Sequence, residues 1–428
     1  GSGGLVNTAH VPNLPEVLGG PDGYQLDAEV QARYAAWLAE HPYEMGTGWA
    51  QEPWFQPEMP LGEDFVRAAA QRAETAFIVI GRTAGEDQDN SNTPGSFLLT
   101  EGEENMLALV CRHFKKSVVL LNVGNIIDMQ WVMRYNPGAV AYIWQGGQEG
   151  CRGVLDVLNG TVNPCGKLPD TIACTPADYP AADHYGADDR NIYAEDIYVG
   201  YRYFETFAPE KVLYPFGFGL SYTKFEVRLL SADETADGIT AFAAVQNTGS
   251  CSGKEVVQLY VADCTGTTGR PPKELRKFVK VKLEPGEEKQ VEFTLTAQDL
   301  SYYDETLGSW YAAPGEYKIL LGHSSRDIHA TLSVRFSTPR RRPFVIDENT
   351  TIGELSKDDR TAGIIQQVLA QAGNALTGGN VGGSEIASSE AVAQMLDSMP
   401  LRGIVNFGGP AAAGMITPLL EILRAAIQ

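Results

Sequence analysis

Three short apolar runs constrain the first half of the chain more than any other feature of its sequence. Residues 77–80, 118–123 and 139–144 are almost wholly apolar, as strands buried on both faces are. Amphipathic helical patterns lie between and around these runs, at residues 65–72, 101–114, 126–134 and 149–158. Apolar strands that alternate with helices form a mostly parallel sheet with helices on both faces. The sequence therefore predicts an α/β sandwich, which we assign to residues 1–222.

A second pattern begins near residue 223, where short segments alternate apolar and polar side chains. Turn sequences separate these segments, such as NTG at 247–249 and PG at 285–286 and 314–315. Seven strands are expected, at residues 225–229, 240–245, 255–261, 280–283, 290–295, 315–321 and 330–336. Seven alternating strands of this kind are typical of an immunoglobulin-like β-sandwich, which we assign to residues 223–337.

The remaining segments are expected to be less regular. Residues 176–222 are rich in Tyr, Asp and Gly, lack periodicity and are predicted to be a long loop. One helix is expected in the irregular first 60 residues, at 27–40. Because the chain opens on a glycine turn with no strand before it, we expect it to begin inside a domain. Residues 338–428 are interpreted as a basic linker and a helical extension, with helices at 350–372, 387–399 and 416–427 and a flexible joint at 378–383.

The composition of the chain limits which binding partners and which cellular compartment can be expected. The 428 residues include 33 basic and 54 acidic side chains, and the formal charge of −21 disfavours nucleic acid or an anionic membrane as a partner. No apolar run is long enough to span a bilayer, and no secretion signal is visible at the N-terminus. The six cysteines show no metal-ligand spacing, so we interpret them as reduced thiols in a cytoplasmic or anaerobic setting and expect a cytoplasmic location. Without a Walker loop, a dinucleotide fingerprint or a G-x-S-x-G elbow, no cofactor and no metal are expected.

The candidate site follows the first predicted strand. A polar loop there carries Glu86, Asp87 and Asp89, at the position where an open α/β sheet places its ligand site. Thr100 and Glu103 then form a capping box at the start of the next helix. By itself the loop is also compatible with a solvated acidic surface, which is the commoner origin of such charges. Because the six histidines are scattered, the chemistry reduces to carboxylates, and pairs of carboxylates carry out glycoside hydrolysis.

Several motifs occur together and in a fixed order. The predicted α/β sandwich contains QGGQEG (145–150), DVLNGTVNPCGKLPDT (156–171), IYVGYRYFE (197–205) and YPFGFGLSYT (214–223). The predicted β-sandwich adds NTG (247–249), EVVQLYV (255–261), RPPKELRKF (270–278) and LEPG (283–286). Together they resemble glycoside hydrolase family 3, of the β-glucosidase type, over roughly residues 1–337. The resemblance implies that the α/β sandwich is followed by a fibronectin-III-like domain.

The resemblance also implies a function, that of a retaining β-glycosidase in which Glu86 is the general acid/base. A β-linked oligosaccharide or glycoside would be the substrate, cleaved at its terminal non-reducing sugar, whose identity stays open. In this family a (β/α)8 barrel carries the nucleophilic aspartate, and nothing in this chain resembles that barrel. We therefore expect the C-terminal part of such an enzyme, whether a fragment, a processed chain or half of a split enzyme. It would need the barrel segment as a partner and would be inactive alone.

Other residues receive secondary roles. Asp89 is a candidate for substrate binding, although loop support is favoured, because Asn90 stands where many family members have arginine. Lys167 and Arg202 lie inside motifs and are expected to form structural ion pairs. Five tyrosines of the predicted loop are expected to pack within the protein rather than stack on sugars, namely Tyr185, Tyr193, Tyr198, Tyr201 and Tyr203. The alternative function is a non-catalytic carbohydrate-binding or scaffold module.

Overall fold

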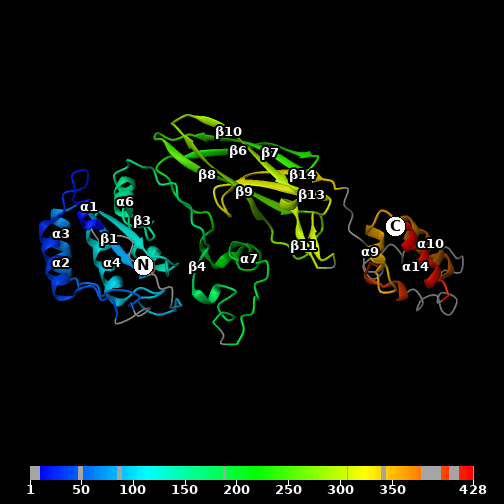
Figure 1. The fold of residues 1–428 in the computed structure, drawn as a ribbon, viewed down its shortest axis with the longest axis horizontal. Helices are drawn as coiled ribbons and strands as arrows, with labels where there is room; N and C mark the ends of the chain where they lie inside the picture. The colour runs from blue at the N-terminus through cyan, green and yellow to red at the C-terminus, as the bar shows by residue number, and fades with distance from the viewer. Residues whose placement is uncertain are drawn as a thin grey trace. The chain divides into compact units, whose positions relative to one another are not determined.

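The computed structural model describes residues 10–46, 52–83, 89–186, 189–305, 307–338, 344–376, 397–403 and 414–427. The chain divides into two compact units. The first comprises Gly1–Tyr302 and Ala312–Thr338, and the second comprises Tyr303–Tyr311 and Pro339–Gln428. The first unit contains both an α/β sandwich and a β-sandwich (Figure 1). The domain boundaries expected at residues 222 and 337 stay predictions.

A parallel sheet forms the centre of the α/β sandwich. Its strands are β1 (Thr75–Gly81), β2 (Lys116–Asn122) and β3 (Ala139–Tyr142), in the order β1-β2-β3. The register pairs Gly81 with Asn122 and Leu121 with Tyr142, so all three strands end at the same edge. The three predicted strands are confirmed, and β3 ends before Trp144, which adopts a left-handed φ of 52°.

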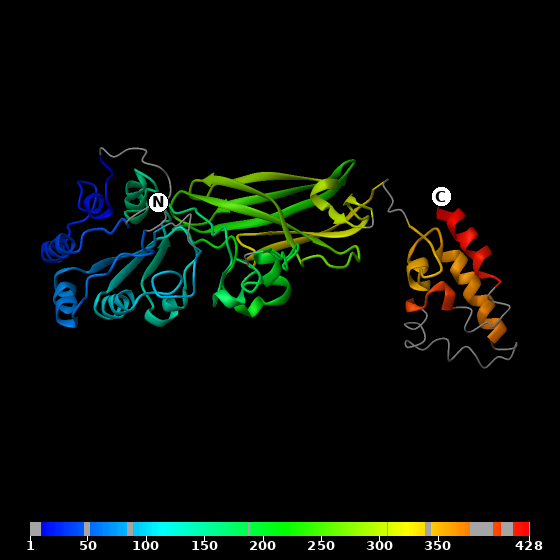
Figure 2. The ribbon, with the colours of Figure 1, turned by 60° about the horizontal axis from the view of Figure 1, so that its bottom comes forward.

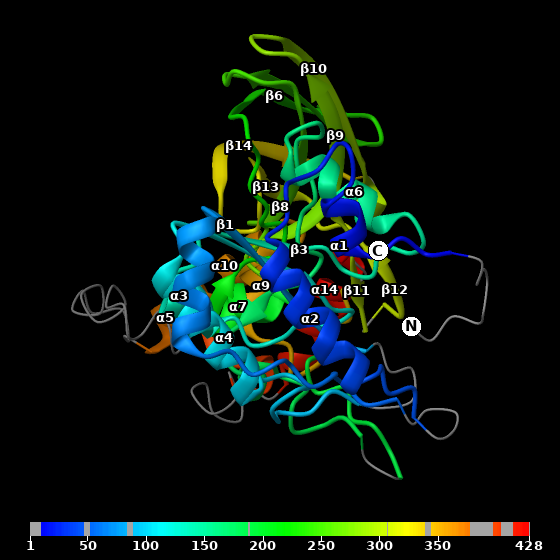
Figure 3. The ribbon, with the colours of Figure 1, turned by 90° about the vertical axis from the view of Figure 1, so that its left-hand side faces the viewer.

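Helices cover both faces of this sheet, as the sequence predicted. On one face α3 (Glu63–Arg72), α4 (Glu101–His113) and α5 (Gln130–Tyr135) pack on Ile78 and Ile80 of β1. On the other face α1 (Leu14–Leu18) and α6 (Gly150–Leu158) pack on Phe77 and Leu120. Figure 3 shows the two helix layers on opposite sides of β1 and β3. The alternation of side chains along β1 therefore divides the core into two layers.

Two helices depart from the prediction. The helix expected at 126–134 begins only at Gln130, because the Asp128 backbone N–H donates to Phe97 O (2.9 Å) and its carboxylate accepts from the Gln130 N–H (3.1 Å). The helix at 27–40 is present as α2 (Ala28–Glu40), capped by Asp27. Its shared apolar face is not buried, however, and the side chain of Leu38 is 59% exposed.

The segment 176–222 is more ordered than a long loop. It contains α7 (Tyr201–Phe207) and β5 (Val212–Tyr214), which pairs antiparallel with β4 (Ile172–Ala173). Aromatic packing holds it: the Tyr201 ring stacks on Phe216 with centroids 4.9 Å apart, and Phe204 is fully buried. Of the five tyrosines expected to pack, Tyr201, Tyr203 and Tyr198 meet other rings, whereas Tyr193 is 85% exposed and Tyr185 is exposed as well.

The β-sandwich has the seven predicted strands in two antiparallel sheets (Figure 2). One sheet has the order β10-β7-β6, with β6 (Phe225–Thr235), β7 (Gly238–Asn247) and β10 (Glu288–Thr296). The other has the order β14-β13-β8-β9, with β8 (Gly253–Asp263), β9 (Glu274–Leu283), β13 (Gly315–Gly322) and β14 (Ile328–Phe336). Alternate side chains such as Ile239, Leu259 and Ile319 are fully buried between the sheets. A short helix, α8 (Ala297–Leu300), follows β10.

The second unit combines a hairpin with short helices. The hairpin pairs β11 (Tyr302–Asp304) with β12 (Ser309–Tyr311). The helices are α9 (Ile352–Lys357), α10 (Ala362–Leu376) and α14 (Ile416–Ile427), and their core includes Leu355, Ile365 and Leu423. The single helix expected at 350–372 is thus divided into α9 and α10, with Asp358 and Arg360 bonded to each other between them. The expected turn at residues 1–4, the joint at 378–383 and most of the helix at 387–399 lie outside the described residues.

Two predicted structural ion pairs are confirmed within the first unit. Lys167 Nζ lies 3.0 Å from Glu255 Oε1, and Arg202 Nη1 lies 3.8 Å from Glu274 Oε1. Glu255 is also contacted by His323 Nδ1 at 3.0 Å, and all three side chains of this cluster are largely buried. The cluster therefore joins a motif of the α/β sandwich to strand β8 of the β-sandwich.

The carboxyl of Glu255 provides a test of this cluster. Burial raises its pKa, but the His323 ring and the Lys167 charge outweigh burial, so the net pKa lies below the ordinary value of 4.5. A lowered pKa in the folded state stabilises the fold above the ordinary value, and this contribution is lost as pH falls through the folded pKa. We expect Glu255→Gln to lower the free energy of unfolding at pH 7 by about 3–5 kcal/mol, because Lys167 stays buried without its counter-charge.

Chemical denaturation followed by tryptophan fluorescence measures this loss, which should shrink when the experiment is repeated at a pH below 4.5. An exposed pair provides the control, since Glu226 Oε1 lies 3.6 Å from Arg228 Nε with both side chains about half exposed. Glu226→Gln should lower the free energy of unfolding by less than about 1 kcal/mol. Equal losses from the two variants would contradict the role given to Glu255.

Candidate active site

The candidate site lies at the carboxyl end of β1, where the chain enters the loop between β1 and α4. Glu86 and Asp87 fall within residues 84–88, outside the described residues. The described flanks are Arg82 and Thr83 on one side and Asp89 and the residues after it on the other. The position after a parallel strand agrees with the sequence-based expectation for the site.

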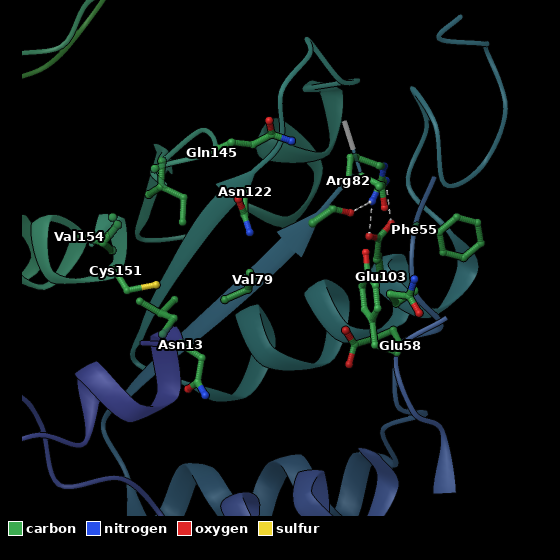
Figure 4. A pocket seen from close by; sticks show the side chains of 18 of the residues that line it. Asn13, Phe55, Glu58, Val79, Arg82, Glu103, Asn122, Gln145, Cys151 and Val154 are labelled. Atoms are coloured by element: carbon green, nitrogen blue, oxygen red, sulfur yellow. Dashed lines mark hydrogen bonds and ion pairs between the residues drawn. The ribbon is translucent and has the colours of Figure 1, made fainter. Parts of the chain in front are cut away.

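Arg82 is the most deeply buried charged group beside this loop. Its side chain is 3% exposed, and its guanidinium forms a bidentate ion pair with Glu103 of α4, at 2.6 Å to Oε1 and 3.0 Å to Oε2 (Figure 4). The same guanidinium donates to the carbonyl oxygens of Ser96 (2.9 Å), Gly81 (2.7 Å) and Leu98 (3.1 Å). Glu103 is also part of the predicted capping box, since its Oε2 accepts from the Thr100 N–H at 2.8 Å. One ion pair thus links both ends of the loop.

The second half of the loop is folded on itself. Ser96 Oγ donates to Asn90 Oδ1 and accepts from the Ser91 N–H (3.0 Å). Asn90 in turn donates through Nδ2 to Ile126 O (3.3 Å), and its backbone oxygen accepts from the Tyr185 hydroxyl (3.2 Å). These bonds connect the loop to the segment after β2 and to the tyrosine-rich segment.

Asp89 differs from its neighbour Asn90. Its side chain is exposed, and within the described part of the chain it forms no hydrogen bond or ion pair. Asn90 therefore supports the loop, a role that the sequence favours for Asp89. A role for Asp89 in substrate binding stays a prediction.

A cavity of about 650 Å³ opens beside the loop (Figure 4). It is bordered by the end residues of β1 and β2, Gly81 and Asn122, and by the Ile143–Gly147 segment that follows β3. Figure 4 shows Arg82 and Glu103 on one side of the cavity and Cys151 and Val154 of α6 on the other. Aromatic side chains form much of the wall, namely Tyr34, Trp37, Tyr43, Phe55 and Trp144. The arrangement can hold a ring-shaped ligand by stacking, with polar groups at its rim.

Sequence reasoning missed Glu58, a titratable group in this wall. Burial raises the pKa of its carboxyl, whereas the Tyr34 hydroxyl and the Met59 N–H oppose the shift by donating to Oε1, both at 3.0 Å. Burial and the neighbouring carboxylate also raise the pKa of the Tyr34 hydroxyl. Glu58 therefore takes up a proton at higher pH than an exposed glutamate does. It lies in an irregular segment without any motif, so no sequence signal marked it.

A metal site and a membrane-spanning helix each place requirements on the described residues. Within the described ranges, no group of three or more His, Cys, Asp or Glu side chains is arranged to hold a metal ion. Among the same residues, no helix combines the length and the apolar character that crossing a bilayer requires.

Comparison with known proteins identifies the class of domain. Residues 26–222 match the model of the glycosyl hydrolase family 3 C-terminal domain, and residues 255–325 match a fibronectin type III-like domain. Residues 26–222 therefore belong to the C-terminal domain of glycosyl hydrolase family 3, and the resemblance noted in the sequence is confirmed.

Several β-glucosidases are similar in sequence to most of this chain. A β-glucosidase of Ruminococcus albus is 47% identical over 332 residues, covering 76% of this chain and 35% of the relative. The thermostable β-glucosidase B of Acetivibrio thermocellus is 35% identical over 371 residues, covering 83% of this chain and 47% of the relative. The chain thus spans a third to a half of the length of these relatives.

Solved structures show the same fold. The β-glucosidase of Paenibacillus barengoltzii superposes with a TM-score of 0.73 at 43% identity, over 79% of this chain and 38% of that protein. β-Glucosidase 3B of Thermotoga neapolitana, in complex with glucose, gives a TM-score of 0.70 at 31% identity, over 77% of this chain and 47% of that protein.

The pair of Tyr34 and Glu58 gives a prediction for the cavity. Tyr34→Phe removes one of the two donors to Glu58 Oε1, so we expect the pKa of Glu58 to rise further. Carbon-13 NMR of a glutamate-labelled chain measures the titration, and Glu58→Gln assigns the signal. Tyr303→Phe, at an exposed ring of β11, is the control and should leave the titration unchanged. An unchanged or lower Glu58 pKa in Tyr34→Phe would show that the bond is not formed.

Proposed function

We propose that this chain supplies the general acid/base of a retaining β-glycosidase, whose nucleophile lies on a (β/α)8 barrel in another segment. One observation carries the proposal: residues 26–222 belong to a domain of a glycoside hydrolase family, and a carboxylate-bearing loop follows β1 in that domain. The related proteins are named β-glucosidases, so a glycoside with a terminal non-reducing β-linked sugar is the proposed substrate. We assign the acid/base role to Glu86.

The proposed reaction has two steps. In the first, the nucleophilic aspartate of the barrel attacks the anomeric carbon while Glu86 donates its proton to the departing glycosidic oxygen. In the second, Glu86 accepts a proton from water as the water oxygen attacks the same carbon and releases the aspartate. The two carboxyl groups of such a pair lie about 5 Å apart, so the barrel must come close to the end of β1.

In this proposal the residues that the structure describes hold the chain beside the loop and line the cavity, and no proton transfer is assigned to them. Arg82 and Asn90 fix the chain on the two sides of residues 84–88. The aromatic cavity beside Arg82 offers a surface for part of the substrate. We further infer a cytoplasmic location, which the six free cysteines support.

The second candidate is a non-catalytic carbohydrate-binding or scaffold module. The cavity with its aromatic wall favours this reading, because stacking on sugar rings needs no acid or nucleophile. A neighbouring coding sequence for a (β/α)8 barrel would favour the enzyme, and binding of sugars without any dependence on Glu86 would favour the module.

We expect the 428-residue chain alone to hydrolyse aryl β-glucosides no faster than buffer does. A lone general acid contributes only about 10²–10⁴-fold, and a retaining reaction also needs a nucleophile. Release of nitrophenolate from the purified chain provides the measurement. Activity that is lost on replacing an aspartate within this chain would contradict the proposed division of roles.

In the complete enzyme, Glu86→Ala should separate substrates by their leaving groups. A disaccharide should lose about 10²–10⁴-fold in the first step, whereas a dinitrophenyl glycoside needs no proton and should lose far less. Glycosyl-enzyme should then accumulate, because the second step has lost its base. Azide needs no deprotonation and should restore turnover by forming the β-glycosyl azide.

Glu101→Ala is the matched control, since Glu101 is an exposed glutamate at the start of α4, and it should leave both substrates unaffected. Equal first-step losses for both substrates in Glu86→Ala, without rescue by azide, would refute the acid/base role. Asp87 and Asp89 would then be the next candidates.

A further inference from the structure

We propose that the buried Arg82–Glu103 ion pair positions the acid/base, an inference that rests on the proposed function of Glu86. Arg82 precedes Glu86 by four residues, and Glu103 lies on α4, beyond the end of the loop. Both side chains border the cavity but are buried, at 3% and 8% exposure, so only a small part of either can face a ligand there. The pair would act through Glu86, as a positioning element rather than as a catalytic group.

The guanidinium of Arg82 uses all of its hydrogen-bonding capacity on the two ends of this loop and on α4. Arginine has five N–H donors in a rigid plane, and Arg82 makes five hydrogen bonds. Three go to backbone carbonyls, of Gly81 before residues 84–88 and of Ser96 and Leu98 after them. The other two go to the carboxylate of Glu103. Both ends of the loop are therefore fixed relative to one planar group.

Stability alone does not account for such an arrangement. Replacing a buried ion pair by apolar side chains of similar volume is often neutral or stabilising, because two charges must be removed from water. An apolar pair, however, cannot bind three carbonyl oxygens in fixed directions, as a planar fork of donors does. The ion pair therefore fixes the position of the backbone at both ends of the loop, which an apolar pair could not do.

Accuracy of this kind has a kinetic consequence. A displacement of about 1 Å in a reacting group costs on the order of 10²-fold in rate. Residues 84–88 are only five, and a second set of bonds holds the residues on either side of them. Thr83 N–H donates to Trp54 O (2.8 Å), and Asn90 is bonded to Ile126 and Tyr185. Among the three residues that anchor the loop, Arg82, Thr83 and Asn90, Arg82 is the one whose side chain is charged and buried.

Arg82→Lys in the complete enzyme tests the proposal. Lysine keeps the charge but has three donors and no fork, so it cannot hold the carbonyls and Glu103 together. We expect the first-step rate on a disaccharide to fall on the order of 10²-fold, and the rate on a dinitrophenyl glycoside to fall far less. The limb of the pH profile that reports the pKa of the general acid should shift as well, because the substitution changes the surroundings of the Glu86 carboxyl.

Arg270→Lys is the matched control. Arg270 is also buried, at 8% exposure, and pairs with Asp263 (3.0 Å) and Glu274 within the β-sandwich. It should destabilise the fold without changing the ratio of the two substrates. In the 428-residue chain, hydrogen exchange of a peptide covering residues 89–98 should rise in Arg82→Lys and stay unchanged in Arg270→Lys.

The outcomes separate this inference from the proposed function. Equal losses on both substrates in Arg82→Lys, in an enzyme whose Glu86→Ala variant is rescued by azide, would overturn positioning and leave the acid/base role intact. Failure of the Glu86→Ala test would overturn both, and faster exchange in Arg82→Lys would then describe a purely structural pair. A changed substrate ratio in Arg82→Lys that exceeds the change in Arg270→Lys would support positioning.

Discussion

Parallel pairing of three short strands is the constraint on which the candidate site depends. Because β1, β2 and β3 run in the same direction and in register, Gly81, Asn122 and Tyr142 end at one edge of the sheet. The loops that leave these ends must therefore lie beside each other, although they are separated by tens of residues in sequence. Arg82 and Thr83, at the start of the loop after β1, and the Gln145 segment after β3 border the same cavity for this reason. The side-chain alternation that divides the core into two layers keeps the strands in this register.

The loop after β1 is held mainly by polar contacts. Between residues 89 and 100 only Phe97 and Leu99 contribute large buried apolar side chains. Carbonyls turned toward the protein interior must find donors there, because an unpaired buried carbonyl costs about 1–3 kcal/mol. Arg82 supplies three such donors from one side chain, and Glu103 neutralises the charge that this brings inside. The capping box of α4 and the ion pair share the same carboxylate, so the start of the helix and the ends of the loop are fixed together.

Sequence rules predicted those parts of the structure that depend on local patterns. The apolar runs gave the three parallel strands, alternation gave the seven strands of the β-sandwich, and Thr100 with Glu103 gave the start of α4. Contacts between distant charges could not be predicted. The residues of the Arg82–Glu103 pair are 21 positions apart, and nothing in the sequence indicates that they meet. The helix α7 was missed because tertiary packing of its aromatic side chains stabilises it, while its residues have modest helix propensity. The role of Glu86 came from family motifs alone, and no pattern in the sequence pointed to Glu58 or to the aromatic cavity wall.

An acid and a nucleophile on different domains place two separate demands on the protein in the proposed reaction. The acid must be fixed within its own domain, and the domain must be fixed relative to the barrel. A displacement of either one changes the distance of about 5 Å between the two carboxyl groups. The anchors of Arg82, Thr83 and Asn90 address only the first demand. They do so independently of any partner, since all of their bonds lie within this chain. Substitutions at these anchors should therefore affect the step that needs the acid, whereas weakening the contact with the barrel should reduce attack by the nucleophile on every substrate. A rate loss that depends on the leaving group thus indicates a misplaced acid within this domain, whereas an equal loss on every substrate indicates a weakened contact between the domains.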